Sequence, residues 1–204
     1  MPLLGVTGGI ATGKSSFTRA FSAQFEVEIF DADRCARELL SDDSQVRVEV
    51  ESAFGPEIYR PDGTPDRTRL RELTFSNPGH RAALERILHP RIRAAWLGLA
   101  KECSAGDRSL LVDIPLLFET GAETHFDVII VVACSPATQR RRLGEQRALS
   151  TDVAEKMIGA QLDLGTKIRK ADHLIWNDST FSCLHGQAEL LARCLRRHTR
   201  SPLP

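Results

Sequence analysis

The sequence has no long hydrophobic run. Its longest uninterrupted apolar stretch, Val128–Cys134, has seven residues, whereas a membrane-spanning helix needs about 20. The first residues, Met1–Gly5, carry no basic side chain ahead of an apolar segment, so they do not have the pattern of a secretory signal. We therefore expect a cytoplasmic protein that has no membrane partner.

An excess of charge of one sign is also missing. Lys and Arg number 27, Asp and Glu number 27, and the formal net charge is zero, so we expect no nucleic-acid partner. CxxC spacing is absent as well, and the number of cysteines, five, is odd. That pattern argues against a zinc site or a disulfide framework and favours free thiols. The hydrophobic share of 42% is typical of a folded globular protein.

Short apolar segments recur along the chain, separated by longer segments with helical spacing. They are Leu3–Thr7, Val27–Asp31, Ser109–Ile114, Phe126–Cys134 and His173–Trp176. The first four do not alternate with polar residues, which is typical of strands buried on both faces of a parallel sheet. The alternation with helices therefore predicts an α/β fold with a parallel sheet.

Two intervals between these strands are too long for a single crossover. Roughly eighty residues separate the second and third strands, far more than one connecting helix needs. Helical patterns occur there at Arg81–Ile87 and Ile92–Glu102, with a turn at Pro61-Asp62-Gly63 before them. We expect a mostly helical insertion, and a second helical excursion between Cys134 and His173 that begins at Ser135-Pro136.

The strongest motif is Gly8-Gly9-Ile10-Ala11-Thr12-Gly13-Lys14-Ser15, which fits GxxxxGK[ST] without a gap. It follows the first expected strand and opens the first expected helix, the context in which this motif binds nucleotide phosphates. Lys14 would reach the β- and γ-phosphates, and the Ser15 hydroxyl would bind Mg²⁺. The phosphate-binding residues that we expect are Gly8, Gly9, Ala11, Thr12, Gly13, Lys14, Ser15 and Ser16. Neither Asn-Lys-x-Asp nor Asp-x-x-Gly follows, so a GTPase is disfavoured.

Acidic residues follow two of the expected strands. Asp31 and Asp33 end the second strand and Asp113 falls near the end of the third, where ligands bind in open parallel sheets. Because residues two apart on a strand share a face, either Asp31 or Asp33 could orient the attacking hydroxyl, and Asp113 is a candidate Mg²⁺ ligand. The alternative is that these aspartates only start the next helix.

Four arginines lie on one expected helix. Arg140, Arg141, Arg142 and Arg147 have only Glu145 to oppose them. Arginines on a mobile lid can stabilise the charge of a phosphoryl group in transfer. A solvated helix face is an equally good interpretation of such a run of charge.

Further motifs make the sequence resemble the bacterial dephospho-CoA kinases over nearly its whole length. They are Asp31-Ala32-Asp33, Leu88-His89-Pro90, Pro115-Leu116-Leu117-Phe118-Glu119 and the series Gln161, Lys167, Asp172 and Asn177. In this order they are far more specific than the phosphate loop alone.

The resemblance implies an α/β fold in three parts. A P-loop core with a five-stranded parallel sheet would comprise residues 1–34, 108–137 and 170–204. A helical acceptor-substrate subdomain would comprise residues 35–107, and a helical lid residues 138–169.

The resemblance also implies the reaction and its site. ATP would phosphorylate the ribose 3′-hydroxyl of dephospho-CoA, with Mg²⁺ held by Ser15 and Asp113. Asp33 would be the base, Lys14 and Arg142 would stabilise the transferring phosphoryl group, and Asn177 would belong to the ATP site. We expect a monomer or a weak homo-oligomer. The alternatives are another P-loop kinase with a nucleoside or nucleotide acceptor, and a nucleotide-binding switch without turnover.

Two positions depart from the family pattern. Gln146 stands where an arginine is common, so Arg147 either replaces that arginine or the contact is lost. Asp178-Ser179 stand where a small or glycine-containing turn is usual. His89 is equally consistent with ligand binding and with packing at a junction between two helices beside Pro90.

Overall fold

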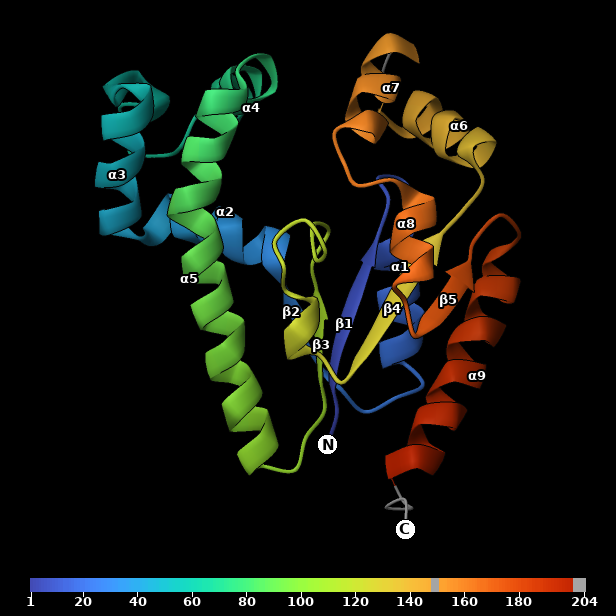
Figure 1. Ribbon diagram of the computed structural model, residues 1–204. Coiled ribbons are helices and arrows are strands. Elements are labelled where there is room, and N and C mark those ends of the chain that lie inside the picture. Colours follow the sequence, from blue (N-terminus) through green and yellow to red (C-terminus); the bar gives the residue numbers. More distant parts are fainter. Residues whose placement is uncertain (148–150, 200–204) are drawn as a thin grey trace. The chain divides into compact units, whose positions relative to one another are not determined.

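A computed structural model of the chain, which describes residues 1–147 and 151–199, has an α/β fold around a five-stranded parallel sheet (Figure 1). The strands are β1 (Leu3–Gly8), β2 (Glu28–Asp31), β3 (Leu110–Asp113), β4 (Val128–Ala133) and β5 (His173–Trp176). Their order in the sheet is β2-β3-β1-β4-β5. The strand β1 pairs in parallel with β3 and β4, and β4 pairs in parallel with β5. The expected fold class and all five strands are therefore confirmed.

Helices connect the strands, as the alternating pattern predicts. The helices are α1 (Lys14–Ser22), α2 (Ala32–Asp42), α3 (Ser44–Phe54), α4 (Arg67–Ser76), α5 (Pro78–Ala105), α6 (Pro136–Arg147), α7 (Thr151–Gly159), α8 (Leu164–Arg169) and α9 (Phe181–Thr199). Two short 3₁₀ helices, η1 (Pro56–Ile58) and η2 (Glu123–His125), complete the described elements. No described helix is both long and apolar enough to cross a membrane.

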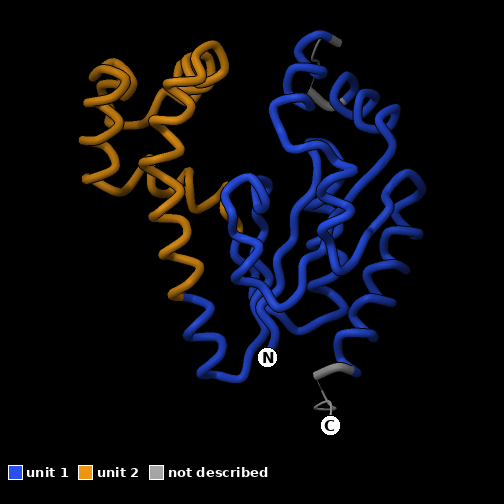
Figure 2. Tube along the Cα trace, in the orientation of Figure 1, with its two compact units in different colours: residues 1–30, 99–204 blue, residues 31–98 orange. Residues whose placement is uncertain are grey.

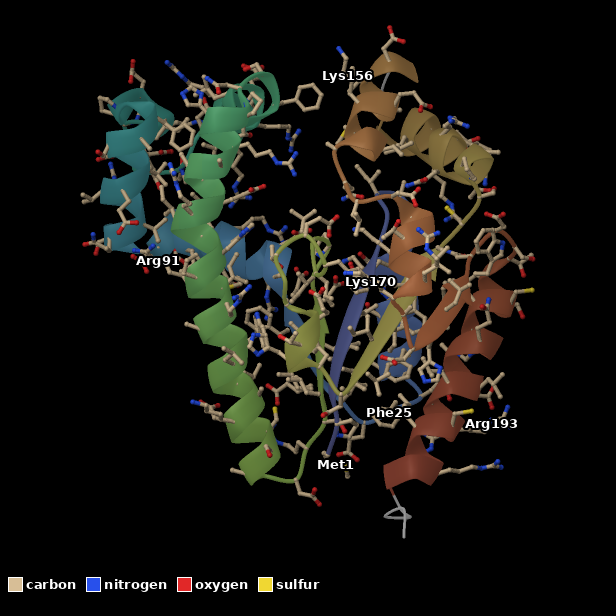
Figure 3. All side chains as sticks on the ribbon, in the orientation of Figure 1. Met1, Phe25, Arg91, Lys156, Lys170 and Arg193 are labelled. Carbon is tan, nitrogen blue, oxygen red and sulfur yellow. The ribbon has the colours of Figure 1, made fainter. Side chains whose placement is uncertain are left out.

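One face of the sheet is covered by α1 and α9. The rings of Phe17 and Phe21, on α1, stack at 5.6 Å between centroids, and Phe21 stacks on Phe25 at 5.2 Å. These rings share a buried cluster with apolar residues of β1, β3, β4, β5 and α9, and Figure 3 labels Phe25 beneath the sheet. Burial of such rings is the main source of stability for this face. The C-terminal edge of β1, from which the phosphate loop leaves, is thereby anchored.

The chain divides into two compact units, residues 1–30 with 99–204 and residues 31–98 (Figure 2). The first contains the phosphate loop and most of the sheet, and residues 138–169 belong to it. The second has its own core, in which Tyr59 donates a hydrogen bond of 2.9 Å to the Leu40 carbonyl. Its turn at Pro61-Asp62-Gly63 forms as expected, with Gly63 at a φ of 84°.

Of the two interpretations of His89, packing at a junction between two helices beside Pro90 is wrong. The single helix α5 runs through Pro90 from residue 78 to residue 105, although proline removes one backbone donor and crowds the preceding turn. A guanidinium N–H of Arg91 donates to the Ile87 carbonyl at 2.7 Å, which supplies a donor in the turn that Pro90 disturbs. Partial burial lowers the pKa of His89, which favours the neutral form of this imidazole.

All five cysteines lie among the described residues and are free thiols, as expected. Burial raises the pKa of the Cys134 thiol, which follows β4. A protonated buried thiol is unreactive. Cys134, which is 1% exposed after the inner strand β4, packs in the interior.

Candidate functional site

The segment between β1 and α1 forms a tight loop with two residues in the left-handed region. Ala11 has a φ of 59° and Gly13 a φ of 92°. At Gly13 a Cβ would lie 2.1 Å from Nδ2 of Asn177, so only glycine fits there. Alternation of right- and left-handed residues turns successive N–H groups toward one concave side, which is the geometry of an anion-binding nest. The loop is therefore shaped to receive phosphate oxygens.

The helix α1 starts from this loop and adds to its positive potential. Gly13 occupies the N-cap position and has no side chain that could satisfy the first N–H groups of the helix. Ser15 and Ser16 are exposed in the first turn of α1. The N–H groups of the first turn, which no side chain caps, and the helix dipole both favour a bound anion here.

Lys14 forms an ion pair with Asp113, the last residue of β3. Both side chains are nearly buried, with 15% and 9% of their surface exposed. Asp113 lies beside Val6 in the parallel register of β3 with β1, so the adjacent strand brings a carboxylate to the loop. The structure thus brings together the expected phosphate-binding lysine and the expected metal ligand.

Asn177 and Arg142 donate hydrogen bonds to backbone carbonyls of the loop. The buried Asn177 donates from Nδ2 to the Thr12 carbonyl at 2.8 Å. Arg142, on α6, donates to the carbonyls of Ala11, Thr12 and Asn177 at 3.3, 3.1 and 2.8 Å. Three carbonyls around one guanidinium fix its position. Both expected site residues therefore contact the loop backbone in this structure.

Arg140 and Arg141, which are also on α6, form ion pairs away from the loop. Arg140 pairs with Glu155 of α7, and Arg141 pairs with Glu145 one turn along the same helix at 2.9 Å. The hydrogen bond and charge of Glu155 raise the pKa of Arg140. The side chains of Gln146 and Arg147 lie outside the described residues. For Arg140 and Arg141 the geometry fits a solvated face, whereas Arg142 contacts the loop.

We expect alanine substitution to separate these arginines. Arg142→Ala should raise the ATP KM and lower kcat, by on the order of 10² in kcat/KM, because loop support and a cation beside the phosphates are lost together. Arg140→Ala removes only an exposed ion pair, so its effect should stay within about threefold. Steady-state kinetics of both variants and of Arg147→Ala test this. Equal mild effects in all three would mean that the helix face is only solvated.

Lys167 is a fully buried lysine that joins three segments at the back of the loop. Its side chain, on α8, has 0% exposure and pairs with Glu119 at 2.8 Å, whose side chain is 21% exposed. Its Nζ also donates to the Pro115 carbonyl at 3.1 Å, and it lies 3.4 Å from the Gly8 carbonyl. The carboxylate of Glu119 accepts a further hydrogen bond from the Leu162 amide. These contacts tie the Pro-Leu-Leu-Phe-Glu segment and α8 to the end of β1.

The placement of Asp31 and Asp33 differs from the expectation. The strand β2 ends at Asp31, and α2 begins at Ala32, so the two aspartates do not share a strand face. Asp31 is the N-cap of α2 and accepts a hydrogen bond from the Arg34 amide at 2.8 Å. Asp33 is exposed in the first turn of α2, within the second compact unit. The helix-cap alternative is therefore right for Asp31.

Asp178 has a structural role at the neighbouring strand ends. Its carboxylate accepts a hydrogen bond of 2.7 Å from the Ser135 amide, just before α6. Desolvation opposes ionisation, but hydrogen bonds from Ser135, Thr138 and Trp176 outweigh it and lower the pKa of Asp178. The residue that departs from the family pattern thus joins the start of α6 to the segment after β5.

Sequence reasoning did not single out Gln139. Its buried side chain donates to the Ile10 carbonyl at 2.8 Å. The available signal was its spacing of three residues from Arg142, which places both on one face of a helix. Gln161, which belongs to the family pattern, accepts a hydrogen bond from the Ile10 amide at 2.9 Å.

Comparison with known proteins agrees with these features. The family model described as dephospho-CoA kinase matches residues 2–182. A dephospho-CoA kinase from Chlorobaculum tepidum is 37% identical over 201 residues, covering 96% of each chain. A crystal structure from Thermus thermophilus superposes with a TM-score of 0.77 at 26% identity, covering 97% of this chain and 98% of that one. The dephospho-CoA kinase of Campylobacter jejuni shares the fold, with a TM-score of 0.66 at 24% identity over 95% and 97% of the chains.

Proposed function

Because this chain belongs to the dephospho-CoA kinase family, we propose that its phosphate loop and the side chains around it form the ATP site of that reaction. The enzyme transfers a phosphoryl group from ATP to the ribose 3′-hydroxyl of dephospho-CoA, giving CoA and ADP, the final step of coenzyme A biosynthesis. The observation that carries the site is the loop itself, with Ala11 and Gly13 in the left-handed region and Lys14 at the start of α1.

The loop binds the phosphates of ATP through its backbone amides. All residues from 8 to 16 except Ile10 surround the β- and γ-phosphates, and the N-terminus of α1 adds positive electrostatic potential. Lys14 neutralises charge that develops on the transferring phosphoryl group, and Arg142 does so from α6. Asn177 acts through the loop, because its amide holds the Thr12 carbonyl.

Ser15 and Asp113 suit a magnesium ion that arrives with ATP. One hydroxyl and one carboxylate are hard oxygen donors, and Mg²⁺ takes its remaining ligands from phosphates and water. No cluster of three or more metal-binding side chains exists among the described residues, which fits an ion shared with a nucleotide. The ion would supply neutralisation of phosphate charge.

Asp33 is the base that we propose for the acceptor hydroxyl. It is exposed in the first turn of α2, whereas the carboxylate of Asp31 is engaged by the backbone. An exposed carboxylate can approach an acceptor within hydrogen-bonding distance, as a general base must. It accepts the 3′-hydroxyl proton as the oxygen attacks the γ-phosphorus.

The remaining assignments follow the same proposal. Residues 35–107 bind the acceptor, residues 138–169 act as a lid, and the enzyme works in the cytoplasm as a monomer or weak homo-oligomer. Residues 31–98 are a compact unit with their own core, which supports a separate acceptor-binding part that begins four residues and ends nine residues before the proposed bounds.

A substrate panel tests the function. ATP consumption should be stimulated by dephospho-CoA, with CoA as the product, and not by nucleosides or nucleoside monophosphates. Stimulation by a nucleoside without any by dephospho-CoA would support another P-loop kinase. ATP binding without stimulation by any acceptor would support a nucleotide-binding switch.

Lys14→Ala tests the loop. The lost electrostatic stabilisation should cost about 3 kcal/mol, or on the order of 10² in kcat. Circular dichroism and a thermal melt establish that the variant is folded, and initial rates at saturating dephospho-CoA give kcat. Turnover close to that of the wild type in a folded variant would contradict the role of Lys14.

A further inference from the structure

Two glutamine side chains form hydrogen bonds with one residue of the phosphate loop, one with its backbone N–H and the other with its backbone carbonyl. Gln161 accepts from the Ile10 amide at 2.9 Å, and Gln139 donates to the Ile10 carbonyl at 2.8 Å. Gln139 comes from α6 and is only 4% exposed, and Gln161 follows α7. We call Gln139 and Gln161 the Ile10 clamp.

The orientation of each side-chain amide in the clamp is fixed by its partner. A backbone N–H can only donate and a carbonyl can only accept, so Gln161 must present its oxygen and Gln139 its nitrogen. Residue 9 is also adapted to the clamp, because a Cβ at Gly9 would lie 2.8 Å from Nε2 of Gln139. Glycine at this position therefore lets the end of the Gln139 side chain approach the loop without a shift.

The clamp determines the direction of neighbouring groups in the loop. In a trans peptide the C=O and N–H bonds point in opposite directions. When Gln139 holds the Ile10 carbonyl, the Ala11 N–H of the same peptide points away from Gln139. When Gln161 holds the Ile10 amide, the Gly9 carbonyl points away from Gln161, and it accepts from the Thr12 hydroxyl at 2.8 Å.

We propose that Gln139 is a positioning residue for ATP binding, because its donor fixes the peptide whose N–H, that of Ala11, bonds a phosphate oxygen. This inference rests on the proposed ATP site. Without a donor at position 139 the Ile10 peptide can rotate, which turns the Ala11 N–H away from the phosphate. Gln161 holds the preceding peptide and needs only an acceptor.

Replacement of Gln139 by a titratable group gives the sharpest test. Gln139→Glu puts a carboxylate against the Ile10 carbonyl, so the dissociation constant of ADP should rise about tenfold relative to wild type at pH 8. Burial raises the pKa of a carboxyl at this position, and the protonated acid again donates. The ratio of variant to wild-type dissociation constants should therefore fall at least about threefold between pH 8 and pH 5.5. Calorimetric titration with ADP measures it.

Three companion variants make the outcome decisive. Gln139→Met removes the donor without adding a titratable group. It should bind ADP weakly, and the ratio of its dissociation constant to that of the wild type should stay constant over this pH range. Gln161→Glu adds the same charge beside the same residue but keeps the acceptor, so its loss should be clearly smaller. Gln24→Glu, beyond the far end of α1 and next to His185, controls for added charge elsewhere and should bind ADP like the wild type.

The inference and the ATP site fail in different ways. Wild-type affinity of Gln139→Met, or equal losses for Gln139→Glu and Gln161→Glu, would overturn the positioning role while Lys14→Ala still weakens ADP binding. Unchanged ADP binding by Lys14→Ala would instead overturn the proposed site. If Gln139→Glu does not fold, Gln139→Met alone decides the inference.

Discussion

Asp33→Asn should lose most phosphoryl transfer while ATP binds nearly as it does to the wild type. The substitution is close to isosteric, so it removes charge and basicity with little change in packing. Loss of a general base typically costs about 10²–10⁴ in rate. We expect that loss in kcat, measured under saturating Mg²⁺ and both substrates, with the ATP dissociation constant changed by less than about threefold.

Asp31→Asn is the matched control for Asp33→Asn. Asp31 caps α2 through its carboxylate, and asparagine is about as good an N-cap as aspartate, so both the fold and the chemistry should be little affected. The assignment of the base would be wrong if Asp33→Asn turned over normally while Asp31→Asn was inactive. Two wild-type-like variants would leave the reaction without a carboxylate base from this segment.

Removal of the carboxylate that pairs with Lys167 should destabilise the protein strongly. Glu119→Leu leaves an ammonium with 0% exposure and no counter-charge, and breaking a buried ion pair in this way costs about 3–5 kcal/mol. Lys167→Met should cost less, because the Glu119 carboxylate is 21% exposed and can be hydrated. Urea denaturation of both variants and of the double variant gives the three free energies of unfolding.

A more exposed ion pair nearby provides the control. Lys170 pairs with Glu123 at 3.2 Å with 48% and 29% of the side-chain surfaces exposed, and Figure 3 labels Lys170 beside α8. Glu123→Leu should change the free energy of unfolding by less than about 1 kcal/mol. If Glu119→Leu lowered the free energy of unfolding as little as Glu123→Leu, the carbonyls of Gly8 and Pro115 alone would have to satisfy the Lys167 ammonium.

The strands could be predicted because a short, continuously apolar segment is typical of a strand that is buried on both faces of a parallel sheet. The segment at residues 128–133 is almost fully buried between neighbouring strands, and no polar pattern competes with that outcome. A helix boundary at Asn77-Pro78 can also be predicted from the sequence, because proline favours the first position of a helix; α4 ends at Ser76 and α5 starts at Pro78. The continuation of α5 through Pro90 was not visible in the sequence, because proline by its local chemistry favours a helix break.

The sequence by itself determined the fold class, the phosphate loop and the family. These conclusions depend on properties of a linear chain, namely the length of the apolar runs, the order of the motifs and the spacing of Gly8, Gly13 and Lys14. Only the tertiary structure decided what Asp31, Arg142, Gln139 and Lys167 do, since each role depends on a partner distant in sequence or on where a strand ends. A charged or amide side chain has the same local signature whether it faces water or a backbone carbonyl. Which of the two it faces is settled by the packing of α6 and α8 behind the loop.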